Sequence, residues 1–445
     1  MLLKLEKILF YVFLFLIPFQ IRTTISWQGN EWDSMFLYLT DLLLIGFLFL
    51  AIINKRISFK KSDILLFLFL IIAGISIFVS TDLGISIYRF IKLVEFVLLF
   101  VYINKSYRAD RTYRTYSVLI AAGLLQSALA IVQFYKQSSL GLKFIEAGQY
   151  LPGAPGVATF IMGSEKVMRA YGSFPHPNVL AAFLLLAIFC FYYLWISNLI
   201  KGKFCYMLYV ICYMVCVFGL FLTFSRGPIL VFIFISMIFF LARFFQLRVQ
   251  YHTEERLLAG KRLMLLALFF VVFSVLSTII LMPYIKNRFF IISLQEEAID
   301  LRFFYNKIGL AIIKEKPLLG VGIGNFVNFS HNYPAFIRAA NAMLSGGQGD
   351  VEIPDWLYQP VHNIYLLIAS EIGILGLIVF LLFIIMRLIR IPIRMTRIDN
   401  PFLFLVICYL LLGLSDHYFW TLQSGGLMLW IALGLLETGR SENGN

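Results

Sequence analysis

Three basic side chains stand at the edges of long apolar runs, where they could act on a phosphorylated substrate. Arg226 lies in the segment TFSRG (223–227), and Arg302 precedes the aromatic triplet FFY. A guanidinium can donate two parallel hydrogen bonds to a phosphate, so both arginines are candidates for binding a diphosphate. His362 opens an apolar run, and an imidazole with its pKa near neutrality suits a general base. The simpler interpretations are a snorkelling Arg226, an Arg302 anchored at the membrane interface and a surface His362.

A second set of polar residues flanks proline-rich and aromatic segments. Arg169 precedes YGSFPHPN (171–178), in which two prolines make a rigid entry to an apolar run and Asn178 could cap a helix. Asp416 and His417 open the polar segment DHYFWT. We include Arg169, Asp416 and His417 among the candidate substrate-binding residues, because the topology derived below places all three on one side of the membrane.

Four charged residues fall inside apolar runs instead of beside them. They are Asp41 in one run and Arg89, Lys92 and Glu95 in another. Charges at such a depth cost several kcal/mol unless they are paired or hydrated. The second set steps by three residues and therefore shares a broad helix face. Two interpretations stay open: a salt-bridge cluster that locks helix packing, or a polar path that faces an anionic headgroup.

The overall composition places these residues in a membrane. The 445 residues are 61% hydrophobic and only 14% charged, 46 of them are Phe, and the mean hydropathy is +0.87. This excludes an ordinary cytosolic enzyme, a disordered chain and a disulfide-rich secreted protein, but it leaves a transporter, a channel or a membrane-embedded enzyme. All five cysteines lie in apolar runs without a set of metal ligands, so we interpret them as small apolar side chains.

The apolar runs predict an all-α polytopic membrane protein with about 12 transmembrane helices. Spanning a hydrocarbon core takes about 20 apolar residues, although the first run and the last two are shorter. The expected spans are 8–21, 35–53, 64–80, 85–103, 115–135, 178–199, 204–224, 227–245, 263–285, 363–386, 402–415 and 424–436.

The distribution of basic residues predicts the orientation. With the N-terminus inside, the inner segments carry 22 Lys and Arg, whereas the short outer loops carry only Arg22 and Arg226. The positive-inside rule then places both termini in the cytoplasm. It also accounts for the net charge of +13 without a nucleic acid partner. The predicted organisation is a five-helix region (1–135), an outer loop (136–177), a four-helix region (178–285), a large extracytoplasmic loop (286–361) and C-terminal helices (362–436).

Several motifs of this chain occur together in one protein family. The pattern H-N-x9-G-x-x-G runs from His362 to Gly376, and it follows an outer loop that contains R-x17-G from Arg302 to Gly320. Within that loop stands PLLGVGIGNF, and TFSRG and GSFPHPN lie upstream. In this order, over residues 165–425, the motifs resemble the O-antigen ligase and polymerase superfamily of bacterial envelope enzymes.

The resemblance implies a fold, a location and a reaction. The fold is all-helical, with a large periplasmic loop over a cavity in the bacterial cytoplasmic (inner) membrane. The reaction moves a glycan from undecaprenyl diphosphate to a hydroxyl of a glycolipid or glycan acceptor, such as lipid A-core, with inversion and with no metal or other cofactor. The motif histidine carries over to His362, as the catalytic base, and the loop arginines carry over to Arg226 and Arg302.

This chain departs from the family pattern at two places. Leu377 and Ile378 stand where ligases often have Thr-Thr, and Leu318 stands where some polymerases have the glycine of R-x15-G. A polymerase that uses the same donor is therefore the nearest alternative to a ligase.

Two other classes of protein stay open from the sequence. A secondary transporter or flippase would use ionisable residues near the membrane midplane, as Asp41 and Lys92 could provide. A metal-dependent lipid-linked glycosyltransferase would use an acidic pair in the first outer loop, where Glu31-Trp32-Asp33 stands.

Overall fold

The structure is a computed structural model of the chain. It describes residues 1–57, 59, 63–106, 109–142, 145–148, 150–250, 253–290, 297–345, 351–389 and 400–436. Seven of the 22 inner Lys and Arg residues counted above lie outside these ranges, namely Lys60, Lys61, Arg108, Arg390, Arg394, Arg397 and Arg440, and so does the glycine-rich segment GGQG (346–349).

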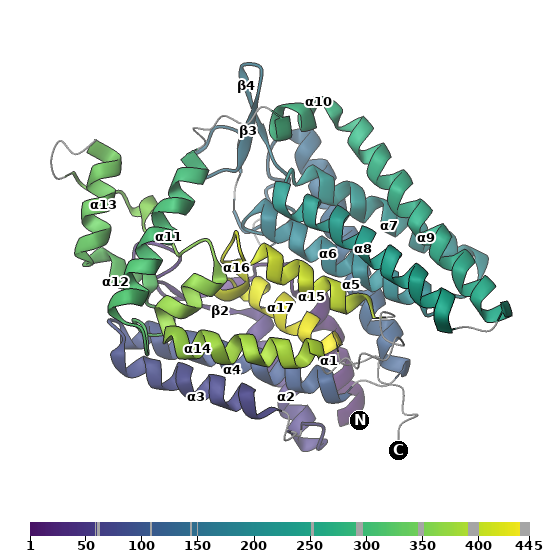
Figure 1. Ribbon diagram of the computed structural model, residues 1–445, viewed down its shortest axis with the longest axis horizontal. Coiled ribbons are helices and arrows are strands. Elements are labelled where there is room, and N and C mark those ends of the chain that lie inside the picture. The colour runs from purple at the N-terminus through teal and green to yellow at the C-terminus, as the bar shows by residue number, and fades with distance from the viewer. Residues whose placement is uncertain are drawn as a thin grey trace.

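Each of the twelve predicted apolar runs forms a helix (Figure 1). Six of them, α5 to α9 and α14, contain stretches long and apolar enough to cross a membrane, and α2, α3, α15 and α17 are shorter apolar helices. The chain is therefore a mostly helical, multi-pass membrane protein. The helices are α1 (Leu2–Leu16), α2 (Leu39–Ile53), α3 (Ile64–Ser76), α4 (Leu83–Ser106), α5 (Ala109–Lys136), α6 (Pro177–Ile196), α7 (Lys203–Leu222), α8 (Arg226–Gln250), α9 (Thr253–Ile280), α14 (Ile364–Ile389), α15 (Pro401–Leu412) and α17 (Gln423–Leu436).

The segment between α1 and α2 is a β-hairpin. The run expected over 35–53 begins as strand β2 (Met35–Tyr38), which pairs antiparallel with β1 (Arg22–Ser26). The chain becomes helical at Leu39, where the Asp41 carboxylate accepts a 2.8 Å hydrogen bond from the Tyr38 backbone N–H and caps α2. This cap explains why the helix begins four residues later than the apolar run.

The two long segments before α6 and before α14 contain short elements of their own. Residues 136–177 hold a second hairpin, β3 (Thr159–Met162) and β4 (Glu165–Met168). The apolar spacing of residues 299–314 predicts an amphipathic helix that ends near Pro317, and it is confirmed as α11 (Glu297–Glu315), which ends two residues before that proline. Figure 1 shows α11, α12 and α13 gathered at one end of the molecule, away from α8 and α9. The remaining elements are η2 (Ile77–Val79), α10 (Met282–Ile285), η3 (Lys286–Phe290), α12 (Phe326–His331), α13 (Pro334–Ser345), η4 (Asp355–Leu357) and α16 (Tyr418–Thr421).

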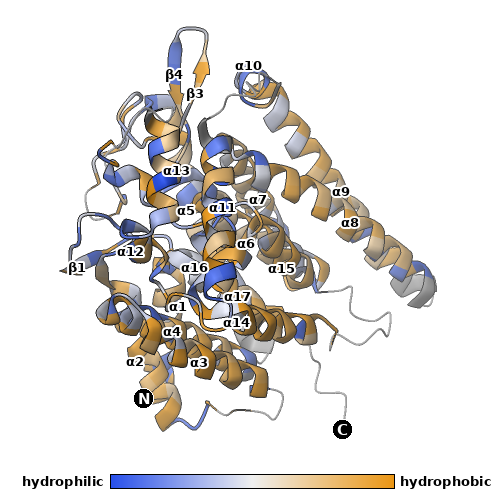
Figure 2. Ribbon diagram, turned by 60° about the vertical axis from the view of Figure 1, so that its left-hand side comes forward, coloured by the Kyte–Doolittle hydropathy of each residue, from blue (hydrophilic) through white to orange (hydrophobic). Residues whose placement is uncertain are grey.

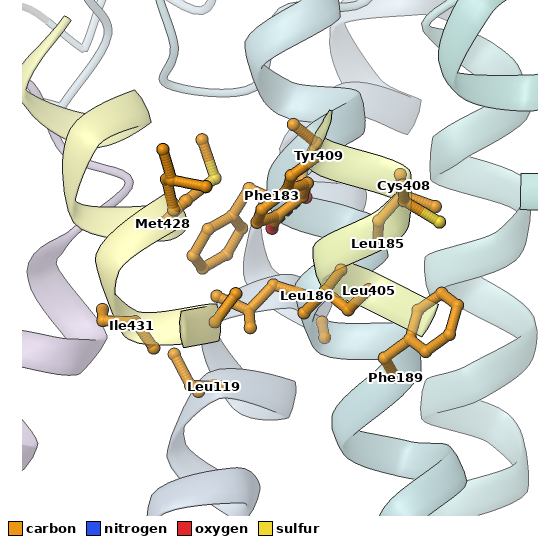
Figure 3. Packing of buried hydrophobic residues seen from close by; sticks show 14 of the residues in the cluster. Leu119, Phe183, Leu185, Leu186, Phe189, Leu405, Cys408, Tyr409, Met428 and Ile431 are labelled. Atoms are coloured by element: carbon orange, nitrogen blue, oxygen red, sulfur yellow. Dashed lines mark hydrogen bonds between the residues drawn. The ribbon is translucent and has the colours of Figure 1, made fainter. Parts of the chain in front are cut away.

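Helix α6 forms the centre of the bundle. Nearly all its side chains are buried, and they pack against α5, α7, α15 and α17. In Figure 3, Phe183 and Leu186 of α6 lie among Leu405 of α15 and Met428 of α17. Figure 2 shows hydrophobic residues along α8 and α9, and much of α9 is exposed, as expected of a surface that faces lipid. The five cysteines are free thiols, and four of them are buried.

The charged residues of α2 and α4 form a buried cluster. Lys92 pairs with Asp41, and its Nζ lies 3.6 Å from Glu95 Oε2. The Gln423 side-chain amide donates a 2.6 Å hydrogen bond to the second oxygen of Asp41. Of the two interpretations of these charges, the salt-bridge cluster is thus confirmed for Asp41, Lys92 and Glu95. Arg89 has different partners.

Helix α14 is broken at Gly373. This glycine has a φ of +81°, and a Cβ atom there would lie 1.9 Å from the carbonyl oxygen of Leu318. The break frees the carbonyls of Ser370 and Glu371, and the backbone N–H groups of residues 321–322 donate 2.9 Å hydrogen bonds to them. The glycine-rich loop after α11 is thereby fixed against α14.

Candidate active site

His362 lies directly before α14 and is held by aromatic contacts. Its ring stacks on Tyr305 of α11, with centroids 5.5 Å apart, and meets the ring of His417 edge-on at 4.8 Å. Its Nδ1 atom is buried and makes no hydrogen bond with the part of the chain that the structure describes. The imidazole is therefore well positioned while one of its nitrogens is left for another partner.

Asn363, the residue after His362, makes hydrogen bonds both to the start of α14 and to the turn before Asp416. The Asn363 side-chain oxygen accepts hydrogen bonds from the backbone N–H groups of Tyr365 and Leu366, at 2.9 and 3.1 Å, and so caps α14. Its amide donates a 3.2 Å hydrogen bond to the carbonyl of Leu414. One asparagine thus joins the start of α14 to the turn that carries Asp416 and His417.

Asp416 is linked to Arg169 through Asn178. The Asn178 amide donates to Asp416 Oδ2 at 2.8 Å, and its oxygen accepts from Arg169 Nη2 at the same distance. Arg169 is buried and also donates 2.8 Å hydrogen bonds to the carbonyl of Thr223 and the hydroxyl of Ser225. The interpretation of Asn178 as the helix cap is wrong, since the residue that caps α6 is His176.

The electrostatics of this cluster leave its histidines neutral at pH 7. Burial lowers the pKa of His176 to about 3, with the charge of Arg169 adding to the effect. Burial also lowers the pKa of His417 to about 3 and lowers that of His362 below its ordinary value of 6.5. Burial would raise the pKa of Asp416, but the neighbouring histidines and Asn178 outweigh it and lower the pKa. The site therefore combines a carboxylate with neutral imidazoles.

Arg302 lies on α11, one turn before the tyrosine that stacks on His362. Its positive charge contributes to the lowered pKa values of both His362 and His176, which places it beside the cluster. The guanidinium makes no hydrogen bond or ion pair with the described residues and is only partly buried. The structure thus brings Arg302 together with His362, as the sequence analysis expected.

Arg226 is the first residue of α8 and lies at the border of the same cluster. Its Nε donates a 2.9 Å hydrogen bond to the carbonyl of Arg288 in η3. It directly follows Ser225, which binds Arg169, and the charges of Arg226 and Arg288 both lower the pKa of Arg169. The three arginines form a positive region next to the neutral histidines. Arg288 was not predicted as a site residue. Its position just after the apolar run 263–285 could have indicated it, because the short loops predicted on that side of the membrane contain few basic residues.

The glycines of the loop GVGIG and of the break in α14 stand where neighbouring atoms leave no room for a side chain. Gly320 has a φ of +64°, and a Cβ atom there would lie 2.4 Å from the carbonyl oxygen of Ser370. The Glu371 carboxylate accepts 2.9 and 2.8 Å hydrogen bonds from the Gly324 backbone N–H and the Trp420 indole. The loop GVGIG and the break at Gly373 therefore form one unit that connects α11, α14 and α16.

A comparison with known protein families finds one match, to the O-antigen ligase family over residues 208–381. Residues 208–381 belong to the O-antigen ligase domain family. The match contains Arg226, Arg302, His362 and the broken helix, so the histidine and the arginines beside it lie within the family domain. The substrates of this family are lipid-linked glycans.

The rest of the candidate site comes from outside the matched residues. Arg169, Asn178, Asp416 and His417 lie before or after 208–381, yet hydrogen bonds link them in a chain, and the His417 ring meets His362. A comparison with curated proteins finds no match.

Proposed function

We propose that the chain transfers a glycan from undecaprenyl diphosphate to an acceptor hydroxyl, in the manner of an O-antigen ligase. The observation that carries this proposal is His362: a neutral imidazole with an unbonded buried nitrogen, beside Arg302 and the carboxylate of Asp416. His362 lies within the matched O-antigen ligase domain, which supports the same conclusion. The acceptor is lipid A-core or a similar glycolipid or glycan.

The proposed reaction uses the neutral histidine as a general base. The acceptor oxygen attacks the anomeric carbon of the donor sugar, the carbon–oxygen bond to the diphosphate breaks, and undecaprenyl diphosphate leaves with the bonding electrons. His362 takes the acceptor proton, and the nearby Asp416 carboxylate stabilises the imidazolium that forms. Attack from the face opposite the leaving group inverts the configuration at the sugar.

The arginines have a separate role in this proposal. The leaving diphosphate carries negative charge, and Arg302 and Arg226 would bind it, with Arg169 maintaining the positive surroundings. In this mechanism the chain needs no metal, because guanidinium groups neutralise the leaving group. Asp416 and His417 orient His362 next to the acceptor.

A polymerase is the second candidate, and one observation favours it. Leu377 and Ile378 follow Gly376 in α14, where ligases often have two threonines. A polymerase would use the same donor and the same base, with a second lipid-linked glycan as acceptor. The choice concerns only the acceptor side of the site.

Deleting the gene and examining the surface glycans distinguishes these functions. A strain that lacks long-chain lipopolysaccharide and accumulates lipid-linked polymer indicates a ligase, whereas a single repeat unit on the lipid core indicates a polymerase. Unchanged surface glycans, together with uptake of a solute by proteoliposomes that contain the purified protein, would contradict both and indicate a transporter.

A further inference from the structure

A recess lies next to the candidate active site. It has a cavity volume of about 50 Å³, is partly open to solvent, and is formed by the β1–β2 hairpin, α4, α16 and the start of α12. His417 contacts both regions, since its ring meets His362 at 4.8 Å and Trp32 at 4.9 Å. Pro360 and Thr421 also line the recess, and the Thr421 hydroxyl lies 2.8 Å from His417 Nδ1. The recess and the site of His362 thus share a wall.

Eight aromatic residues line this recess. Trp32, Tyr88 and Trp420 line it and are each partly exposed. The first outer loop holds Trp32 in place, because the neighbouring Asp33 accepts from Asn30 and lies 3.1 Å from the His331 ring on α12. Partly exposed indole and phenol rings supply flat apolar surfaces with a polar edge.

Arg89 gives the recess a fixed polar group. Its guanidinium donates hydrogen bonds to the carbonyls of Thr421, at 2.7 Å, and Trp32, at 3.1 Å. Gly324 allows this placement, since a Cβ atom there would lie 2.2 Å from Arg89 Cγ. The sequence left a salt-bridge cluster or a polar path open for Arg89, and its guanidinium instead joins Trp32 to Thr421 at the end of α16.

Two of the three cations that line the recess are paired with carboxylates. Arg22 pairs with Glu31, and Lys92 pairs with Asp41. The Glu371 carboxylate accepts from the Trp420 indole and the Gly324 backbone N–H. A diphosphate in this recess would meet the carboxylates of Glu31 and Glu371, and the third cation, Arg89, already donates to two backbone carbonyls. The chemistry favours an uncharged ligand with many hydroxyl groups, which can stack on aromatic rings and bond to fixed polar atoms.

We propose that this recess binds a sugar unit of the acceptor glycan, an inference that rests on the proposed function. Figure 1 shows β2, the partner strand of β1, on the opposite side of α16 from α10, and η3, whose Arg288 carbonyl binds Arg226, directly follows α10. The arginine region for the diphosphate and the aromatic recess therefore lie on different sides of the His362 cluster. An acceptor in the recess would extend its hydroxyl past His417 to His362. The recess is built largely from residues outside the matched domain, so the segments before and after it would determine acceptor specificity.

The test separates acceptor binding from donor binding. The protein is purified in nanodiscs, and the acceptor probe is the glycolipid fraction extracted from membranes of the deletion strain. Trp32→Ala should raise the KM for this acceptor by about tenfold or more and leave the KM for the donor unchanged, and Trp32→Phe should restore part of the loss. The control is Trp27→Ala, because Trp27 is 58% exposed and does not line the recess. An unchanged acceptor KM in Trp32→Ala, or a raised donor KM, would overturn the proposal.

A direct binding measurement keeps this proposal distinct from the proposed function. The soluble glycan released from that fraction by mild acid should quench the tryptophan fluorescence of the wild type and of His362→Ala, but bind weakly to Trp32→Ala. Binding without any transfer would contradict the proposed transferase activity and leave the recess as a glycan-binding site. Equal binding by wild type and Trp32→Ala, no binding by either, or displacement by inorganic pyrophosphate would overturn the recess proposal.

Discussion

His362 is the residue on which the chemistry depends, and its surroundings decide what it can do. Tyr305 and His417 hold the ring, and Asp416 raises its pKa while burial and Arg302 lower it. The sequence predicted His362, Asp416 and both arginines from their types and motifs. It could not predict that Asn178 would join Asp416 to Arg169. Asn178 and Asp416 are 238 residues apart in the sequence, and an asparagine at the start of an apolar run is typical of a helix cap.

We expect Arg302 to be sensitive even to replacement by lysine. Arg302→Lys keeps the charge but loses the planar fork, and a charge-assisted hydrogen bond contributes about 1.5–3 kcal/mol, or roughly 10- to 150-fold in rate. Transfer by the purified variant measures this loss. The matched control is Arg338→Lys, on the exposed surface of α13, which should transfer at the wild-type rate. Near-normal transfer by Arg302→Lys would mean that a point charge is enough.

The role of Asp416 can be read from the pH dependence of the rate. Its negative charge raises the pKa of His362, so Asp416→Asn should lower that pKa further. Since the neutral imidazole is the base, the acid limb of the rate profile should move to lower pH. The maximal rate should fall at the same time, because the imidazolium loses its counter-charge. An acid limb that moves upward would be evidence against this arrangement.

At the scale of elements, the broken helix α14 connects the motifs to the site. The sequence predicted a span from 363 to 386 and the helix that became α11, but it treated Gly373 and GVGIG as separate signals. Their contact depends on a φ of +81° and on carbonyls freed at the break, neither of which is visible in an apolar pattern. The β1–β2 hairpin was missed for a similar reason, since its second strand continues into an apolar helix.

Gly373→Ala should destabilise the protein. A Cβ atom at this position would overlap the Leu318 carbonyl, and a positive φ in a residue other than glycine costs about 1–3 kcal/mol. We expect a lower Tm in thermal unfolding of the purified protein, or loss of folded protein from the membrane. Gly260→Ala is the control, because this glycine lies in α9 with no atom within 4 Å of the added Cβ, and it should be neutral or slightly stabilising. Equal Tm values for the two variants would contradict the account of the break.

At the scale of the whole molecule, each of the twelve apolar runs contains a helix, and six of these helices are long and apolar enough to cross a membrane. Hydrophobicity alone identifies these helices because each must satisfy its backbone inside the hydrocarbon. How they pack was not predictable, since α6 and α9 are similarly apolar in sequence while α6 is buried and α9 faces outward. The orientation across the membrane is a proposal that rests on the distribution of Lys and Arg.

Cysteine labelling tests that orientation. Ala342→Cys in α13 and Ser164→Cys in the turn between β3 and β4 are both exposed, and they should react with an impermeant thiol reagent in intact spheroplasts. Ser197→Cys, at the end of α6, should react only after lysis. The wild type, whose five cysteines lie within helices, reports the background. The opposite labelling pattern would place the candidate active site on the cytoplasmic side and contradict the proposed donor.

The central claim is that His362 takes the acceptor proton, and the pH profile of transfer by wild type and His362→Ala tests it most directly. General-base catalysis contributes about 10²- to 10⁴-fold, so His362→Ala should lose that much of the rate while still inserting and binding the lipid-linked donor. His362→Gln should be nearly as slow, because an amide cannot accept the proton. Because burial lowers the pKa of His362, the wild-type rate should stay level at neutral pH and fall only below about 6.5, and this fall should be absent from the variants. A His362→Ala enzyme that keeps most of its rate, or that shows the same acid limb as the wild type, would contradict the account.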